Sequence, residues 1–157
     1  MSLTTRPARL EDINILLQFE QGVIEAERPF DPTLKNEQIN YYDLHNLINS
    51  QESELVIAEW DGVIVGSGYV QIRPADPFLQ HTHYGHIGFI YVEPSRRGQG
   101  VVGEVIAALT AWANNKNIPE VRLEVYSDNA RAIKAYEKIG FKQHMIIMRL
   151  DRQSSGI

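Results

Sequence analysis

Residues 92–103 read Val-Glu-Pro-Ser-Arg-Arg-Gly-Gln-Gly-Val-Val-Gly, and this glycine-rich stretch decides the fold that the sequence predicts. It lies between a predicted strand and a predicted helix, so several backbone N–H groups are exposed at the start of the helix, where the helix dipole also favours an anion. Gly98 and Gly100 let the backbone approach a ligand that a Cβ atom would exclude. Arg96 and Arg97 add positive charge at the same place. The stretch indicates a diphosphate-binding turn, although a tight β–α turn with incidental arginines fits the glycine spacing equally well.

Two other nucleotide-binding motifs fit this stretch less well. A nucleotide P-loop requires Gly-Lys-Ser/Thr after the glycines, and here Val101 and Val102 follow. The dinucleotide fingerprint Gly-x-Gly-x-x-Gly matches Gly98, Gly100 and Gly103, but it belongs to the first βαβ unit of a fold, and this turn comes late in the chain. A dinucleotide-binding oxidoreductase therefore stays open as an alternative.

Hydrophobic periodicity and turn residues predict the elements on either side of the turn. Asp61-Gly62 between two β-branched runs predicts a hairpin of residues 55–60 and 63–72. The other predicted elements are helices over 10–21, 36–50, 100–116 and 129–139, strands over 83–92, 121–125 and 141–150, and loops over 28–32 and 73–81. Asn129 is expected to cap the last of these helices and Gly140 to end it. This order predicts a mixed α/β fold with a mostly antiparallel central sheet, one parallel pair around the glycine-rich turn, and helices on both faces.

Composition places the chain among ordinary globular proteins. Its 157 residues predict one domain over 1–152, followed by a tail at 153–157 that we expect to fray. A formal charge of −5 argues against a nucleic-acid-binding protein, which usually carries a basic face. No apolar run is long enough for a membrane span and no leader opens the chain, so the cytoplasm is the expected compartment. The absence of cysteine excludes disulfides, thiolate metal sites and cysteine nucleophiles.

Two motifs, in the right order, resemble the signatures of the GNAT superfamily of N-acetyltransferases. The first is Val92-x-Pro94-x-x-Arg97-Gly98-x-Gly100 followed by an amphipathic helix, which resembles the acyl-CoA signature of that superfamily. The second is Asn129-x-x-Ala132-x-x-Ala135-Tyr136-Glu137-Lys138-x-Gly140-Phe141. The order of elements is also similar to the GNAT fold, so the resemblance covers nearly the whole chain. One departure is Val102, which stands where the superfamily usually has glycine or alanine.

The resemblance implies an acetyl-CoA-dependent N-acetyltransferase that needs no metal and transfers the acetyl group directly to a primary amine in a ternary complex. It implies that the turn holds the pyrophosphate through its backbone, and that the pantetheine arm pairs with strand 83–92 where this strand splays from the next parallel strand. The implied cofactor-binding residues are Ile90, Val92, Arg97, Gly98, Gln99, Gly100, Val101, Val102, Gly103, Asn129 and Tyr136. A non-catalytic acyl-CoA-binding regulatory module is the alternative.

Tyr136 and His86 are the candidate catalytic residues. Tyr136 matches the tyrosine of the superfamily, and a phenol with a pKa of about 10 can donate a proton to the leaving thiolate. Several members carry a glutamate or histidine at the position matching His86, and a neutral imidazole suits removal of a proton from the amine, directly or through water. Period 2 predicts that His86 shares a strand face with Gly88, Ile90 and Val92. A core tyrosine and a structural histidine are the alternatives.

The acceptor site is expected in the more variable segments. Arg28 and Phe30 follow the first predicted helix, Tyr41 and Tyr42 lie in the second, and Tyr84 begins strand 83–92. Acidic side chains between residues 25 and 33 could attract an ammonium group, but a solvated charged loop explains them as well. The expected partner is a small-molecule or peptide amine, with no nucleic acid and no membrane; the identity of the amine and a homodimer stay open.

No metal site is predicted from the three histidines near strand 83–92. His81, His83 and His86 lack a nearby carboxylate in the sequence, and His83 and His86 should point to opposite faces of one strand.

Overall fold

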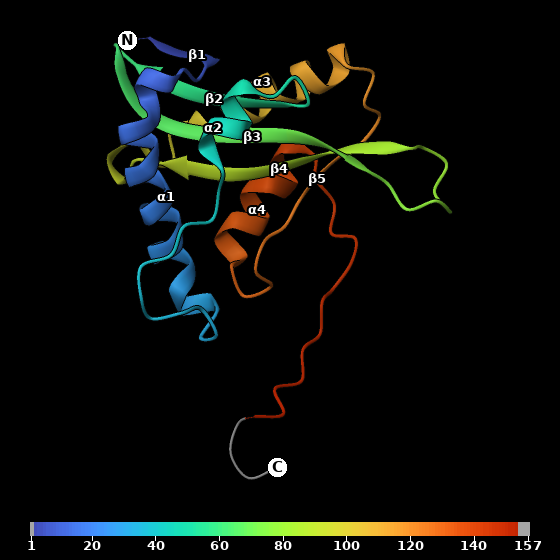
Figure 1. The fold of residues 1–157 in the computed structure, drawn as a ribbon. Coiled ribbons are helices and arrows are strands. Elements are labelled where there is room, and N and C mark those ends of the chain that lie inside the picture. The colour runs from blue at the N-terminus through green and yellow to red at the C-terminus, as the bar shows by residue number, and fades with distance from the viewer. Residues whose placement is uncertain (1, 154–157) are drawn as a thin grey trace. The chain divides into compact units, whose positions relative to one another are not determined.

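One mixed sheet of five strands, in the order β1-β2-β3-β4-β5, organises residues 2–124 of the computed structural model (Figure 1). Its strands are β1 (Leu3–Pro7), β2 (Ser53–Trp60), β3 (Val63–Pro74), β4 (His83–Val92) and β5 (Val121–Leu123). The first three pairings are antiparallel, and β4 pairs with β5 in parallel. The structure describes residues 2–153, of which 125–153 belong to a second compact unit; residues 154–157 of the predicted tail lie outside the described part. The predicted mixed α/β fold is confirmed.

Helices cover both faces of this sheet. The helices of the first unit are η1 (Leu10–Asp12), α1 (Ile13–Glu27), η2 (Arg28–Phe30), α2 (Leu44–Asn49), η3 (Pro94–Arg96) and α3 (Val101–Asn115). α1 packs on the face where Phe19 and Phe89 join the buried core, and α3 lies behind the sheet in Figure 1. A Cβ atom at Gly68 would lie 2.7 Å from Val105 of α3, so a glycine at this position lets the helix approach the sheet closely. These two layers leave β4 between α1 and α3.

The predicted hairpin is confirmed in both strands and in its turn. β2 and β3 pair antiparallel on either side of Asp61 and Gly62. Both turn residues have positive φ, 51° and 83°, as a two-residue type I′ turn requires.

The helix predicted over 36–50 is wrong in extent. The helix observed there, α2, begins after Asp43, whose side chain accepts the N–H of Asn46 at 3.1 Å and caps the helix. Upstream, the N–H groups of Tyr41 and Tyr42 donate to the buried carboxylate of Glu20 on α1, at 2.7 and 2.8 Å. A tertiary contact therefore takes these donors, and the preceding segment is irregular.

The strand predicted over 141–150 is also wrong. These residues form no strand, and the side chains of Met145, Ile147 and Met148 are 76–90% exposed. A strand requires a neighbour for its N–H and C=O groups. In the described part of the second unit, the regular element is the helix α4 (Ala130–Ile139), so no neighbouring strand is present there.

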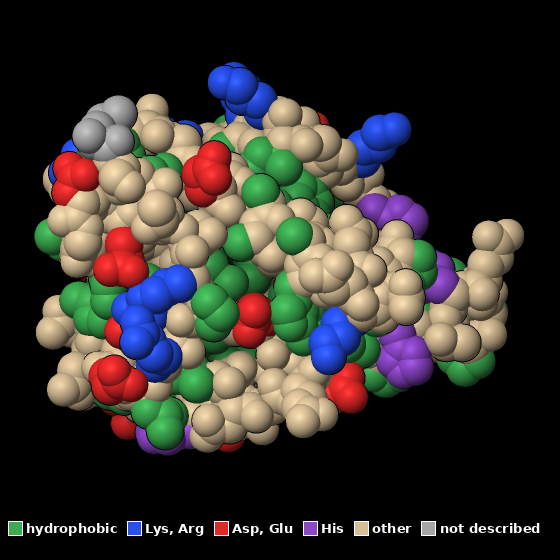
Figure 2. Space-filling model, turned by 90° about the horizontal axis from the view of Figure 1, so that it is seen from above, with side chains coloured by type: hydrophobic (Ala, Val, Ile, Leu, Met, Phe, Trp, Pro, Cys, Tyr) green, Lys and Arg blue, Asp and Glu red, His purple; other side chains and the backbone are tan. Residues whose placement is uncertain are grey.

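The surface seen in Figure 2 carries acidic, basic and apolar side chains interspersed with one another. None of the helices in residues 2–153 has both the length and the apolar character needed to cross a membrane.

A charged junction joins β1 to the first helices. Two nitrogens of the Arg6 guanidinium donate to the Asp12 carboxylate at 2.9 and 3.1 Å, and Arg6 Nε donates to Glu59 at 2.8 Å. Asp12 also accepts the N–H of Arg9 at 2.8 Å, and its side chain is 8% exposed. The hydrogen bonds from Arg6 hold the pKa of Asp12 below its usual value, although burial opposes them.

Replacing Asp12 with asparagine is expected to lower the free energy of unfolding at pH 7 by about 1–3 kcal/mol, because a buried charged partner of Arg6 is lost. A carboxyl group whose pKa is lower in the folded state contributes stability above its unfolded pKa of about 3.9, and this contribution is lost as the pH falls through the folded pKa. Urea unfolding from pH 7 to pH 2 should show the two proteins converging below about pH 4. Glu11→Gln, a substitution at an exposed neighbouring residue, is the control. If the free energy of unfolding of Asp12→Asn differed from that of wild type by the same amount at every pH, this role of Asp12 would be contradicted.

Candidate active site

β4 contains a bulge at Phe89. Ser67 of β3 opposes Tyr91 of β4, whereas Tyr69 opposes Gly88, so β4 has one residue more than β3 over this stretch. Phe89 has a φ of +56°, which is rare for a bulky side chain. Strained backbone of this kind concentrates at functional sites.

The bulge corrects the prediction that four residues of β4 share one face. His86 and Gly88 face Tyr69: the rings of His86 and Tyr69 are 6.0 Å apart, and a Cβ atom at Gly88 would lie 2.7 Å from the ring of Tyr69. Ile90 instead reaches the α3 side, where its Cδ1 would lie 2.8 Å from a Cβ atom at Gly68. The extra residue thus turns the second half of β4 over, so Ile90 and Val92 lie on the face opposite to His86.

The parallel pairing of β4 with β5 is short. It joins Gly85, His86 and Ile87 to residues 121–123 and ends there. From Gly88 to Val92, the β5-side edge of β4 has no paired strand within residues 2–124. An extended ligand can pair with backbone groups along this edge, except the Val92 carbonyl, which accepts from Arg97 Nε at 3.2 Å.

The glycine-rich turn between β4 and α3 is open on its outer side. Gly98 and Gly100 have φ values of +76° and +88°, and a Cβ atom at Gly98, Gly100 or Gly103 would meet no described atom within 4 Å. Glu104 donates the first backbone hydrogen bond of α3, to the Gly100 carbonyl at 3.2 Å. The N–H groups of residues 101–103 therefore precede the helical hydrogen-bond pattern and have no acceptor within the helix.

Side-chain contacts hold this turn against the neighbouring strands. Arg97 Nε donates to the Val92 carbonyl at 3.2 Å, and the Arg96 guanidinium lies 4.4 Å from the ring centre of Trp60. Val101 is buried, and its Cγ1 would lie 2.9 Å from a Cβ atom at Gly66. The Val101 side chain therefore belongs to the core, whereas Gln99 is exposed and Val102 is half-buried.

His86 is half-buried on the α1 face of β4. Burial lowers the pKa of its imidazole, the charge of Arg73 lowers it further, and the charge of Glu124 acts in the opposite direction. A lowered pKa keeps the imidazole neutral at pH 7, the state in which it can accept a proton.

The three predicted acceptor residues do not form one cluster. Arg28 donates to Glu25 at 3.0 Å and to the Lys35 carbonyl at 2.7 Å, so it ties the segment after α1 to the helix. Half-buried Phe30 ends η2 beside it. Tyr84 lies at the start of β4, with the Arg122 guanidinium 3.9 Å from its ring centre.

The histidines near β4 make separate contacts. His81 Nε2 lies 2.6 Å from Glu120 Oε1, and His83 Nδ1 lies 3.0 Å from the Thr82 hydroxyl. Together with the position of His86 beside Tyr69, these contacts describe three different environments.

Sequence reasoning missed the Phe89 bulge and the role of Glu20. The side chain of Glu20 is fully buried, although glutamate is rarely buried without a partner. One signal was available: Glu20 continues the apolar i, i+3, i+4, i+7 series of Ile13, Leu16 and Leu17. A carboxylate on the apolar face of a helix indicates a specific hydrogen-bonding task.

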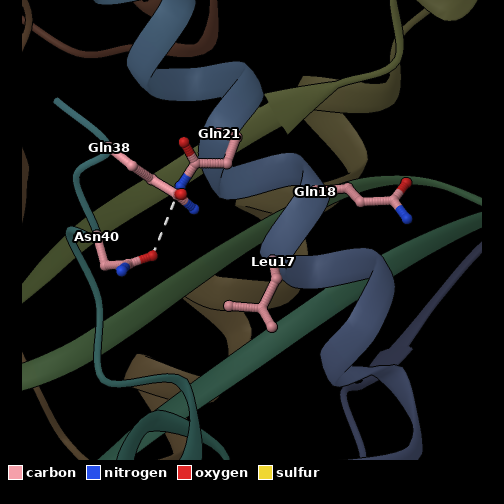
Figure 3. A pocket seen from close by; sticks show the side chains of 5 residues that line it. All are labelled: Leu17, Gln18, Gln21, Gln38 and Asn40. Atoms are coloured by element: carbon pink, nitrogen blue, oxygen red, sulfur yellow. Dashed lines mark hydrogen bonds between the residues drawn. The ribbon is translucent and has the colours of Figure 1, made fainter. Parts of the chain in front are cut away.

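A groove of about 660 Å³ runs along the outer side of α1. In Figure 3, Gln21 reaches from α1 toward Asn40, and its Nε2 donates to the Ile39 carbonyl at 2.8 Å. The lining residues are Leu17, Gln18, Gln21, Gln38 and Asn40, none of which was predicted as a site residue.

The second unit carries the other two predicted site residues, both on or beside α4. Asn129 caps the helix, because its side-chain oxygen accepts the N–H of Ala132 at 3.2 Å. Tyr136 is half-buried, and its ring lies 6.0 Å from that of Phe141 in an edge-on arrangement. Gly140 ends α4 with a φ of +128°, so the cap and the stop predicted for this helix are both confirmed.

Comparison with known sequences identifies a family. A model described as the acetyltransferase (GNAT) family matches residues 20–141. An N-alpha-acetyltransferase of Sulfurisphaera tokodaii is 25% identical over 150 residues, which make up 90% of this chain and 81% of that protein. The chain matches only 24% of the length of YobR from Bacillus subtilis and 34% of a mycothiol acetyltransferase from Parafrankia. Other relatives are named as acetyltransferases of glucosamine 6-phosphate and of aminoglycosides.

Solved structures share the fold. A mutant of the BH1408 protein from Bacillus halodurans has a TM-score of 0.84 at 18% identity, covering 94% of this chain and 98% of that one. A protein described as a predicted acetyltransferase from Clostridium acetobutylicum, solved with acetyl-CoA, has a TM-score of 0.72 at 20% identity and covers 96% of each chain.

Proposed function

The chain belongs to the GNAT acetyltransferase family, and on this basis we propose that it transfers an acetyl group from acetyl-CoA to a primary amine, directly and in a ternary complex. The observation that carries the proposal is the turn at Gly98 and Gly100, which is open on its outer side and leads into the free N–H groups of α3. A Cβ atom at either glycine would enter the space that a diphosphate needs.

The proposed cofactor contacts come mainly from the backbone. The N–H groups of residues 98–103 bind the pyrophosphate, with Arg97 and the helix dipole adding positive potential. The unpaired edge of β4 binds the pantetheine arm through Ile90 and Val92. Because the Val92 carbonyl already accepts from Arg97, Ile90 is the stronger partner for that arm. Asn129 is proposed to approach the same arm.

The proposed reaction moves two protons. The amine nitrogen bonds to the thioester carbon while the carbon–sulfur bond breaks. His86 accepts the proton that the amine loses, directly or through water, and Tyr136 donates a proton to the leaving thiolate. The lowered pKa of His86 supports its role as the base.

Direct transfer is supported by the absence of cysteine, which removes the thiol that a covalent acetyl-enzyme would use. Incubation with acetyl-CoA alone, followed by mass spectrometry of the intact protein, should show no acetylated enzyme. A stoichiometric acetyl-enzyme that passes its acetyl group to an amine would contradict direct transfer.

Ligand choice separates this proposal from a dinucleotide-binding oxidoreductase. CoA and acetyl-CoA should raise the thermal midpoint, whereas NAD and NADH should not, because only a ligand of the native state stabilises it by mass action. Stabilisation by NAD(H) without stabilisation by CoA would overturn the proposal.

The proposal includes a single acetyltransferase domain over residues 1–152 in the cytoplasm. The family match supports the single domain, because it runs without interruption across residues 124 and 125, where the two compact units divide. The names of several relatives support a small-molecule amine as the acceptor.

Replacing His86 with glutamine is expected to lower kcat/KM by about 10²–10⁴-fold, the usual contribution of a general base. Glutamine retains hydrogen bonding but cannot accept a proton at neutral pH. Wild-type kcat/KM should fall as the pH drops through the His86 pKa, below the ordinary value of 6.5, because the protonated imidazole is inactive. Steady-state rates from pH 5 to pH 9 measure both effects.

His83→Gln is the matched control, since His83 is an exposed histidine three residues earlier on the same strand. It should leave kcat/KM and the pH profile unchanged. A His86→Gln enzyme that retains at least half of the wild-type rate would assign His86 a structural role.

A further inference from the structure

Two arginines flank His86, one from each neighbouring strand. The register of β3 and β4 places Gln71 opposite His86 and Arg73 opposite Tyr84. On the other side of β4, Arg122 of β5 is the register partner of His86. Residues that oppose one another in a sheet lie on the same face, so these side chains form one polar row around the proposed base.

The charge of Arg122 is compensated by a carboxylate. Arg122 Nε donates to Glu120 Oε1 at 3.1 Å, and the guanidinium lies over the ring of Tyr84. The same carboxylate oxygen lies 2.6 Å from His81 Nε2. Because the opposite charges are this close together, the field of Arg122 at a group beyond the pair is largely cancelled.

Arg73 has no such counterion. Within residues 2–153, this half-buried side chain forms no ion pair with a carboxylate. Its Nε donates instead to the neutral amide of Gln71, at 3.0 Å. Burial raises the pKa of the Tyr69 phenol, while the charge of Arg73 and a hydrogen bond with its side chain act in the opposite direction. The rings of Tyr69 and His86 are 6.0 Å apart, so an uncompensated cation lies beside the proposed base.

We propose that Arg73 is a positioning residue for the reaction: held by Gln71, its uncompensated charge keeps the imidazole of His86 in the neutral form that accepts the proton of the amine. This proposal rests on the proposed function. A cation disfavours a second positive charge nearby, so Arg73 suppresses protonation of His86 before the amine binds. Arg73 acts through His86 and takes no part in the transfer itself.

The other titratable groups around His86 have separable effects. The phenol of Tyr69 is neutral below pH 9, because burial raises its pKa. Tyr42, whose ring lies 5.8 Å from that of Tyr69, is neutral for the same reason. The exposed carboxylate of Glu124, which follows β5, favours the protonated imidazole. Arg73 and Glu124 therefore act on His86 in opposite directions.

Arg73→Gln should make His86 easier to protonate, so the fall of kcat/KM at low pH should begin at a higher pH than in wild type. At pH 5, kcat/KM should be about three- to tenfold below wild type, as the loss of one nearby charge warrants, whereas the rates should agree at pH 9. Arg73→Lys retains the charge and should retain the wild-type profile. The assay uses acetyl-CoA and the primary amine that the wild-type enzyme acetylates fastest.

Glu124→Gln tests the sign of the effect at an exposed position, where loss of folding is not expected. Its profile should move to lower pH. A purely structural role of Arg73 would instead lower the rate at every pH, and Arg73→Lys and Arg73→Gln would be equally impaired. Such a uniform loss, or an Arg73→Gln profile identical to that of wild type, would overturn the proposal.

Titration of the His86 ring by NMR, in the enzyme without ligands, separates this proposal from the proposed function. The spectrum of His86→Gln identifies the resonance among those of the five histidines. If no amine is acetylated, the proposed function fails, yet a titration that moves to higher pH in Arg73→Gln and to lower pH in Glu124→Gln would still support the action of Arg73 on the imidazole. An unchanged titration in Arg73→Gln, with acetylation intact in wild type, would overturn the role of Arg73 alone.

Discussion

Gly100→Val is expected to abolish CoA binding. In the structure, a Cβ atom at Gly100 would meet nothing within 4 Å, so the added side chain would enter the space proposed for the pyrophosphate. Its φ of +88° is also unfavourable for valine, and this strain should lower stability by about 1–3 kcal/mol. Isothermal titration with CoA, at a temperature where the variant is folded, separates the loss of the site from the loss of stability.

Gly62 provides a matched control for the strain. It has a φ of +83°, and a Cβ atom there would also meet nothing within 4 Å, but it lies in the β2–β3 turn. Gly62→Val should lose a similar amount of stability and bind CoA with wild-type affinity. If Gly100→Val binds CoA as tightly per folded molecule as Gly62→Val does, Gly100 is only a turn residue.

Tyr136→Phe is expected to lower kcat by about 10²–10⁴-fold with little change in acetyl-CoA affinity, because a general acid acts in the transition state. kcat and kcat/KM should fall together. The ring remains, so its edge-on contact with Phe141 is preserved and lost packing cannot explain the result. Steady-state kinetics and titration of acetyl-CoA measure the two quantities separately.

The leaving group offers an internal check on Tyr136. An acyl donor whose thiol has a lower pKa needs less protonation, so the loss in Tyr136→Phe should shrink with such a donor. A variant whose kcat stays within a factor of about two of wild type, far below the usual general-acid contribution, would make Tyr136 structural.

Elements governed by local chemistry were predictable from the sequence. The Asp61-Gly62 turn and the Asn129 cap each depend on residues adjacent in the chain, and both are confirmed. The parallel pairing of β4 with β5 followed from the order of elements. The position of the glycine-rich turn between β4 and α3 is therefore the part of the candidate site that the sequence predicts best.

The features that the sequence does not predict depend on contacts between residues that are distant in the chain. The Phe89 bulge arises from the register of β4 against β3, and strict alternation along β4 could not reveal it. The short α2 reflects the carboxylate of Glu20, which takes the N–H groups of two residues more than twenty positions away. For the same reason, the ring contacts of Tyr42 with Tyr69 of β3 and with Phe89 of β4 have no signature in the local sequence pattern.

The measurement that tests the central claim most directly is the detection of N-acetylated product. Purified protein is incubated with acetyl-CoA and a broad panel of primary amines, and CoA release and acetylated amines are quantified together. The account predicts stoichiometric CoA and N-acetylamine from at least one amine, with both products lost in Gly100→Val. Tight binding of acetyl-CoA without any acetylated amine across the panel would contradict it and would indicate a non-catalytic acyl-CoA-binding module.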